Sequence, residues 1–150
     1  MIDTDQAGTN RLRAVAVLRG GVYATITAIL AIVVIRAVAV LFFKAPEDRE
    51  ILGLAQAAIA IVIGAVAATG TYLLLNLATR HARVVYSVLG IVFLLLSLLW
   101  PIGGHLKPMP NGRLIGTGVM IVLIGFHIVA GTILIVLLPR FAAADPSGGR

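Results

Sequence analysis

The sequence contains no cysteine and few charged residues. Without cysteine no disulfide, thiol nucleophile or thiolate metal site can form, and the redox state of the compartment cannot be read from the chain. Charged residues make up 12% of the 150 positions, about half of the roughly 25% that is usual in soluble globular domains. This deficit excludes a soluble domain as the main body of the protein.

Acidic side chains are absent from the long apolar runs. The six in the chain are Asp3, Asp5, Glu47, Asp48, Glu50 and Asp145. Pumps and transporters commonly move their coupled proton on a carboxylate that lies within the membrane, so this pattern argues against a carboxylate-driven antiporter. Catalytic motifs such as GxSxG and HExxH are absent too, which leaves a lipid-modifying enzyme as the least favoured function.

Hydrophobic residues, in contrast, make up 60% of the chain, and the mean hydropathy is +1.07. They form four long runs, Gly20–Phe43, Ile51–Leu75, Val84–Trp100 and Leu114–Leu138. Each run approaches or exceeds the ~20 residues that cross a bilayer as a helix, the form that pairs every backbone group in hydrocarbon. With short connections, the runs predict an all-α integral membrane protein, a four-helix up-down-up-down bundle.

The runs also predict the organisation of the chain. Residues 1–19 form a polar and amphipathic cytoplasmic segment, residues 20–138 a single transmembrane domain, and residues 139–150 a disordered cytoplasmic tail. The first run is longer than the 7–15 apolar residues of a signal peptide, so we expect it to remain as an anchor. The long loop of this prediction is PIGGHLKPMPNGR, residues 101–113.

Basic residues are divided unequally between the two ends of the runs. With the N-terminus inside, seven lie on the cytoplasmic side, Arg11, Arg13, Arg19, Arg80, Arg83, Arg140 and Arg150. Five lie on or near the outer side, Arg36, Lys44, Arg49, Lys107 and Arg113. Cytoplasmic segments carry the excess of Lys and Arg, so we predict that both termini are cytoplasmic in a bacterial plasma membrane. Because these residues are scattered, nucleic acid is excluded as a partner.

Small residues recur at three- and four-residue spacing in three of the runs. They are Gly20, Ala24, Ala28 and Ala31 in the first, Ala57, Ala60, Gly64, Ala68 and Thr71 in the second, and Ser87, Gly90 and Ser97 in the third. This spacing places them on one face of a helix, where they let neighbouring backbones approach closely. We therefore predict that these faces are contacts between helices.

Arg36 interrupts the apolar stretch AIVVIRAVAVLFFK. An arginine costs ~3 kcal/mol at mid-bilayer and less near a helix end, so the run still inserts. One interpretation is that the guanidinium reaches the outer head groups. Another is that Arg36 pairs with Glu50, near Gln56, in a polar pocket for an anionic head group. Because Arg36 lies near the end of its run, head-group contact or a structural pair is favoured over a ligand site.

His127 lies near the middle of the fourth run. The same depth on the third run falls at Tyr86 and Ser87, so the structural interpretation is a neutral hydrogen bond between His127 and one of them. The functional interpretation is a proton relay or a ligand contact, because imidazole exchanges protons near neutral pH and polar groups within membranes are often functional. The sequence leaves both open.

The candidate ligand-binding residues are therefore Arg36, Gln56, Ser87 and His127. We predict no catalytic residue, no metal site and no cofactor. A metal ion is excluded because the histidines, His81, His105 and His127, fall at three different depths in the predicted bundle and cannot converge on one ion.

Two segments carry a resemblance to a known group of proteins. They are SLLWPI, Ser97–Ile102, and GFHIVAGTILIVLLPR, Gly125–Arg140. The chain resembles a family of small actinobacterial four-span membrane proteins of unknown function, and its richness in Ala, Val and Arg is compatible with a high-GC bacterium. The matching positions are Ser97, Pro101 and His127, while Phe126 stands where the family is expected to have methionine. The resemblance implies location and fold but no reaction.

Within the lipid bilayer, these features predict an accessory or assembly subunit. It would act through helix–helix contacts with another membrane protein or with a second copy of itself. The alternative is a small-molecule or lipid binder, or a transporter, that uses the polar residues within the bundle.

Overall fold

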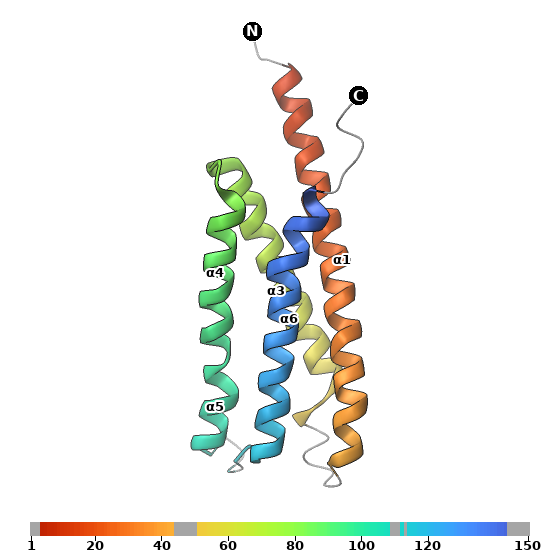
Figure 1. Ribbon diagram of the computed structural model, residues 1–150, viewed down its shortest axis with the longest axis vertical. Helices are drawn as coiled ribbons and strands as arrows, with labels where there is room; N and C mark the ends of the chain where they lie inside the picture. Colours follow the sequence, from red (N-terminus) through yellow and green to blue (C-terminus); the bar gives the residue numbers. More distant parts are fainter. Residues whose placement is uncertain (1–3, 44–50, 109–111, 113, 144–150) are drawn as a thin grey trace.

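The computed structural model describes residues 4–43, 51–108, 112 and 114–143, and its elements are helices (Figure 1). They are α1 (Thr4–Phe42), α3 (Leu54–Ala78), α4 (Ala82–Ser97), α5 (Leu99–Leu106) and α6 (Thr117–Ala143). Four segments of this part of the chain are long and apolar enough to cross a membrane, Ala14–Phe42, Leu54–Ala78, Ala82–Leu106 and Thr117–Ala143. The predicted all-α bundle of four membrane-spanning helices is confirmed.

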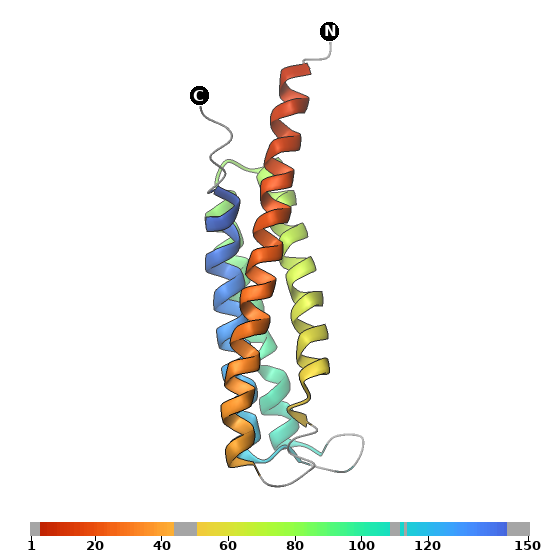
Figure 2. The same cartoon turned by 90° about the vertical axis from the view of Figure 1, so that its right-hand side faces the viewer.

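Consecutive spans run in opposite directions (Figures 1 and 2), and α3 and α6 also contact each other across the bundle. α1 contacts α6 and α3, while α4 contacts α3 and α6, so that α1 and α4 lie on opposite sides of the bundle. We call the end with the α3–α4 turn at residues 79–81 the proximal end. The distal end is the one where α1 finishes and α6 begins.

Both ends of the bundle differ from the predicted boundaries of the chain. α1 begins at Thr4 and continues into the first span without a break (Figure 1). Residues 4–19, which belong to the predicted cytoplasmic segment, are therefore a helical extension of that span. α6 continues past Leu138 through Pro139 to Ala143, because Leu138 and Pro139 are both buried in the bundle. The rest of the predicted tail, residues 144–150, lies outside the described residues.

The third span extends beyond Trp100, where the sequence predicts a loop. Pro101 has no N–H to donate to Ser97, and the helix breaks at Leu98, between α4 and α5. The hydroxyl of Ser97 donates to the carbonyl oxygen of Leu94 at 2.7 Å, which supports the break. Because proline is accommodated in the first turn of a helix, α5 continues the span to Leu106.

The small-residue face predicted for the first run is a helix contact. Gly20, Ala24 and Ala28 are all buried. A Cβ atom built on Gly20 would lie 2.9 Å from the backbone nitrogen of Ala142. α1 and α6 therefore pack with their backbones in contact, as the spacing predicts.

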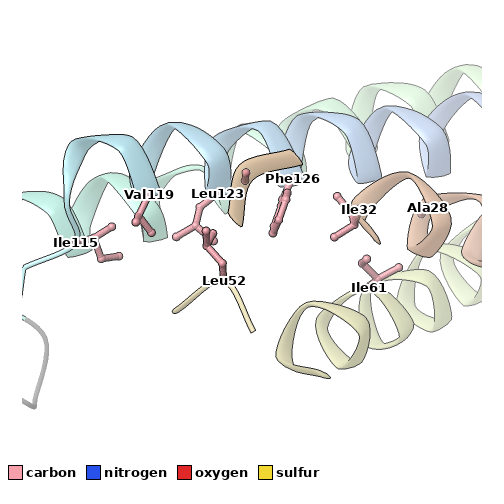
Figure 3. Close-up of a cluster of buried hydrophobic side chains, with 9 residues drawn as sticks. Ala28, Ile32, Leu52, Ile61, Ile115, Val119, Leu123 and Phe126 are labelled. Carbon is pink, nitrogen blue, oxygen red and sulfur yellow. The ribbon is translucent and has the colours of Figure 1, made fainter. Parts of the chain in front are cut away.

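Two clusters of buried side chains form the core. The distal cluster comes from α1, α3, α6 and their flanking segments, and contains Ala28, Ile32, Ala39, Leu52, Ile61, Ile115, Val119, Leu123 and Phe126 (Figure 3). The proximal cluster contains Val17, Ala24, Tyr72, Ala82, Tyr86 and Leu138. α4 contributes only to the proximal cluster, through Ala82 and Tyr86, so its distal half lies outside the core. α5 contributes the buried Pro101 and is hydrogen-bonded to Ile115 of the distal cluster.

Candidate ligand-binding cleft

A cleft of about 890 Å³ lies between α3 and the α4–α5 span and is also lined by α6. It occupies the region where the distal half of α4 contributes no residue to the distal core. Its volume is in the upper part of the range of about 300–1,000 Å³ that is usual for small-molecule sites. The arrangement of the helices therefore leaves room for a ligand of considerable size.

The α3 side of the cleft is built from small residues. All five members of the second small-residue face line it, Ala57, Ala60, Gly64, Ala68 and Thr71. No atom lies within 4 Å of the position that a Cβ would take on Gly64. The prediction that this face is a contact between helices is thus wrong at Gly64, whereas Ala57 and Ala68 pack against the distal and the proximal cluster.

α4 is held on α6 by two reciprocal contacts. A Cβ on Gly90 would lie 2.6 Å from Cγ1 of Ile135, and one on Gly131 would lie 2.8 Å from Cδ1 of Leu94. Each glycine therefore receives a side chain from the opposite helix. These contacts keep α4 against α6, on one side of the cleft.

Tyr86 joins α4 to both of its neighbours at the proximal end. Its ring contacts that of Tyr72 on α3, edge to face, with 5.0 Å between the centroids. Its hydroxyl donates to the carbonyl oxygen of Leu134 on α6 at 3.1 Å. Tyr86, which also lines the cleft, therefore links the three helices around its proximal part.

Five polar side chains line the cleft among mainly apolar ones, namely Gln56, Thr71, Tyr86, Ser97 and His127. The lining residues include no Lys, Arg, Asp or Glu in the described part of the chain. Tyr86 and Ser97 use their hydroxyl protons in hydrogen bonds to backbone carbonyls. The polar groups are therefore neutral and few, which is the usual composition of a site for an apolar or amphiphilic molecule.

His127 contributes a hydrogen-bond acceptor to the cleft. Its Nδ1 lies 2.7 Å from the carbonyl oxygen of Leu123, one turn earlier on α6. Because a carbonyl can only accept, Nδ1 carries the proton, and in the neutral imidazole Nε2 then has a free lone pair. No partner for Nε2 occurs among the described residues.

The structure brings together two of the four predicted site residues. Gln56 and His127 line the same cleft, whereas Ser87 donates its hydroxyl proton to the carbonyl oxygen of Arg83 at 2.9 Å and does not line it. Of the two interpretations of His127, the structural one, a hydrogen bond to Tyr86 or Ser87, does not occur in the structure. Each of these polar groups instead bonds to a backbone carbonyl, and those of His127 and Ser87 belong to their own helices.

Arg36 lies beside the cleft without lining it. Its Nε donates to the carbonyl oxygen of Leu52 at 2.7 Å, and the side chain is half-buried. Leu52 is flanked by Ile51 and Gly53, which do line the cleft. Arg36 is thus held by the backbone just before α3, a partner that the sequence does not reveal. Glu50, its predicted partner, lies outside the described residues.

Ser97, Trp100 and Thr71 line the cleft but were not candidate site residues. Thr71 and Ser97 share the small-residue spacing of the second and third runs, which points equally to a helix contact, and Trp100 is marked only as the end of the third run. Among the described residues, no group of three His, Asp or Glu side chains is placed to hold a metal ion.

Four long apolar helices around a cleft with neutral lining define a multi-pass integral membrane protein with a helical bundle. The chain belongs to a family of unknown function, DUF6069, whose profile matches residues 6–144. The predicted resemblance to small four-span membrane proteins of unknown function is thereby confirmed. No curated protein and no solved structure matches the chain.

Proposed function

We propose that the protein binds a membrane-soluble amphiphilic molecule in the cleft between α3 and α4–α5. The observation that carries this proposal is the cleft itself, about 890 Å³ in volume and lined mainly by apolar and small side chains. If the cleft stayed empty, its lining atoms would lose dispersion contacts, and an apolar cavity does not hold water. A lipid-like molecule that enters from the bilayer restores those contacts.

The length of the cleft favours an extended chain. Its lining residues on the α3 side run from Gly53, the N-cap of α3, to Thr71, and a rise of 1.5 Å per residue separates these two by about 27 Å. This length is close to the ~30 Å thickness of the hydrocarbon core. A chain that lies parallel to the helices therefore occupies the cleft without folding back.

Filling the cleft tests this proposal. Gly64→Leu places a side chain inside the cleft, whereas Gly70→Leu adds the same side chain to open space on the same helix, away from the cleft. Native mass spectrometry of protein released from membranes is expected to show a retained amphiphile on the wild type and on Gly70→Leu. Gly64→Leu is expected to lose it. A wild type without any retained molecule, or equal retention by both variants, contradicts the proposal.

A second candidate function is that of an accessory or assembly subunit. It is favoured by the small-residue face of α3, because such faces are the usual sites of contact between membrane helices, and here no described helix covers its centre at Gly64. The occupant of the cleft would then be a helix of another membrane protein or of a second copy. Crosslinking in membranes followed by native mass spectrometry distinguishes the two functions, since a bound subunit adds a protein mass and a lipid does not.

We also infer that the membrane is the plasma membrane of a bacterium, for which an actinobacterial origin is our working proposal. Both termini would face the cytoplasm. The support is the excess of basic residues on that side, including Arg80 and Arg83 near the α3–α4 turn and Arg140 near the end of α6.

A further inference from the structure

We propose that the occupant of the cleft is an uncharged long-chain amphiphile with a hydrogen-bond donor, such as a hydroxyl group, and that His127 accepts this hydrogen bond. The inference rests on the proposed function and names the chemical class of the molecule bound there. It is argued from the tautomer of His127, from the neutral lining of the cleft and from the depth of His127 in the bundle.

The tautomer of His127 determines which hydrogen-bonding partner is missing. The single proton of the neutral imidazole is used by Nδ1 in its bond to Leu123. Nε2 therefore needs a donor, and a polar atom without a partner is costly in an apolar environment. Neighbouring hydroxyl groups do not supply one, because Tyr86 donates to Leu134 and Ser97 donates to Leu94. Gln56, Thr71 and Trp100 also line the cleft with donor groups, but none of them bonds to Nε2 of His127 among the described residues. A donor carried by the occupant can therefore bond there.

The lining of the cleft excludes a charged group on the part of the molecule that enters it. No Lys, Arg, Asp or Glu lines the cleft in the described ranges of the chain. A buried ion without a counter-charge or several hydrogen bonds is strongly disfavoured. A neutral hydroxyl group needs only one acceptor, which Nε2 of His127 provides.

The depth of His127 excludes the head group of an ordinary phospholipid as the donor. His127 lies about 15 Å along α6 from the start of this helix at Thr117, near the middle of a hydrocarbon core of ~30 Å. Phospholipid head groups remain at the surface of the bilayer and do not reach this level. The donor group must therefore be one that enters the hydrocarbon together with its chain.

A pair of probes that differ only in the donor tests this inference. Purified protein in nanodiscs of zwitterionic phospholipid is incubated with equal amounts of 1-hexadecanol and hexadecyl methyl ether, and the bound ratio is read by native mass spectrometry. The wild type is expected to prefer the alcohol, relative to the ratio in empty nanodiscs, by up to about tenfold, the ratio that one neutral hydrogen bond supports. His127→Phe is expected to bind both probes without this preference.

Each other outcome overturns the inference in a distinct way. Equal binding of alcohol and ether by the wild type, with neither bound by Gly64→Leu, leaves the proposed function intact and removes the role of His127. A preference that persists in His127→Phe also removes that role. If neither probe binds to the wild type, the inference and the proposed function fail together for long-chain amphiphiles.

A second variant protects the test against a folding defect. If His127→Phe does not fold, His127→Leu makes the same comparison with a smaller apolar side chain. The sole tryptophan, Trp100, lines the cleft, so its emission reports occupancy independently of the mass measurement. The preference of the wild type over empty nanodiscs needs no substitution, and its absence overturns the inference even if both variants are lost.

Discussion

At Gly20 the backbones of α1 and α6 are in direct contact. A Cβ on this residue would lie 2.9 Å from the nitrogen of Ala142 and 3.0 Å from the carbonyl oxygen of Leu138. Both are backbone atoms, which cannot rotate out of the way as the end of a side chain can. Because membrane helices associate through close packing rather than through the hydrophobic effect, the missing methyl group at Gly20 sets the distance between these two helices.

Gly20→Ala is therefore expected to destabilise the bundle, by about 1–3 kcal/mol, because the added methyl group overpacks the contact. The matched control is Gly70→Ala, since nothing lies within 4 Å of a Cβ at Gly70. The control is expected to be neutral or to gain up to about 1 kcal/mol from helix propensity. The free energy of unfolding, measured by SDS titration in mixed micelles, checks both variants. Equal effects of the two substitutions contradict this account of Gly20.

At the scale of the elements, the α4–α5 span has the fewest contacts with the core. Its buried residues are Ala82, Tyr86 and Pro101. Tyr86 links α4 to α6 by a hydrogen bond and to α3 by a ring contact, at the proximal end. The middle of the span interdigitates with α6 at Gly90 and Gly131. Its distal end is bonded to Ile115, whose N–H donates to the carbonyl oxygen of Gly104 at 2.9 Å and whose carbonyl oxygen lies 2.7 Å from Nδ1 of His105. Between these points the span stands far enough from α3 to leave the cleft.

Tyr86→Phe is expected to cost about 1 kcal/mol of stability, because it removes the hydrogen bond to Leu134 and leaves that carbonyl without its side-chain donor. The ring contact with Tyr72 is retained. Tyr23→Phe is the matched control, because the Tyr23 hydroxyl has no hydrogen bond among the described residues and the side chain is 47% exposed. The same SDS titration is expected to show no loss for the control. A loss as large as that of Tyr86→Phe would refute the proposed link between α4 and α6.

At the scale of the whole molecule, α1, α3 and α6 form most of the core, and the α4–α5 span packs against it with few buried residues. α1, α3 and α6 build the distal cluster (Figure 3), and α4 joins only the proximal one. The cleft follows from this unequal packing. The two ends of the bundle also differ, since the α3–α4 turn is flanked by Arg80 and Arg83, which is the basis of the inferred orientation.

The absence of native cysteine makes the orientation directly testable. His81→Cys lies at the proximal end and Pro108→Cys at the distal end, both positions are exposed, and neither substitution changes the number of Lys and Arg residues. In intact cells a membrane-impermeant maleimide is expected to label Pro108→Cys and to spare His81→Cys. After permeabilisation both should react. The opposite pattern would reverse the inferred orientation without affecting the four-span fold.

Much of the architecture can be predicted from the sequence, because the requirement for an apolar surface and paired backbone groups acts on each span separately. This requirement predicts four helices and their approximate ends. The face of Gly20, Ala24 and Ala28 is predicted correctly as a contact. The long third span is missed, since Pro101 indicates a stop in the sequence but occupies the first turn of α5 in the fold.

The sequence by itself determined that this chain is a bundle of membrane helices, and it singled out His127 and Gln56 as polar residues within it. Only the tertiary structure decided which small-residue face is covered and which remains open, and that Arg36 bonds to Leu52. The physical reason is that helix association in lipid is the sum of many weak packing contacts. A small-residue face is equally suited to a neighbouring helix and to a ligand, and the distances between helices alone decide between them.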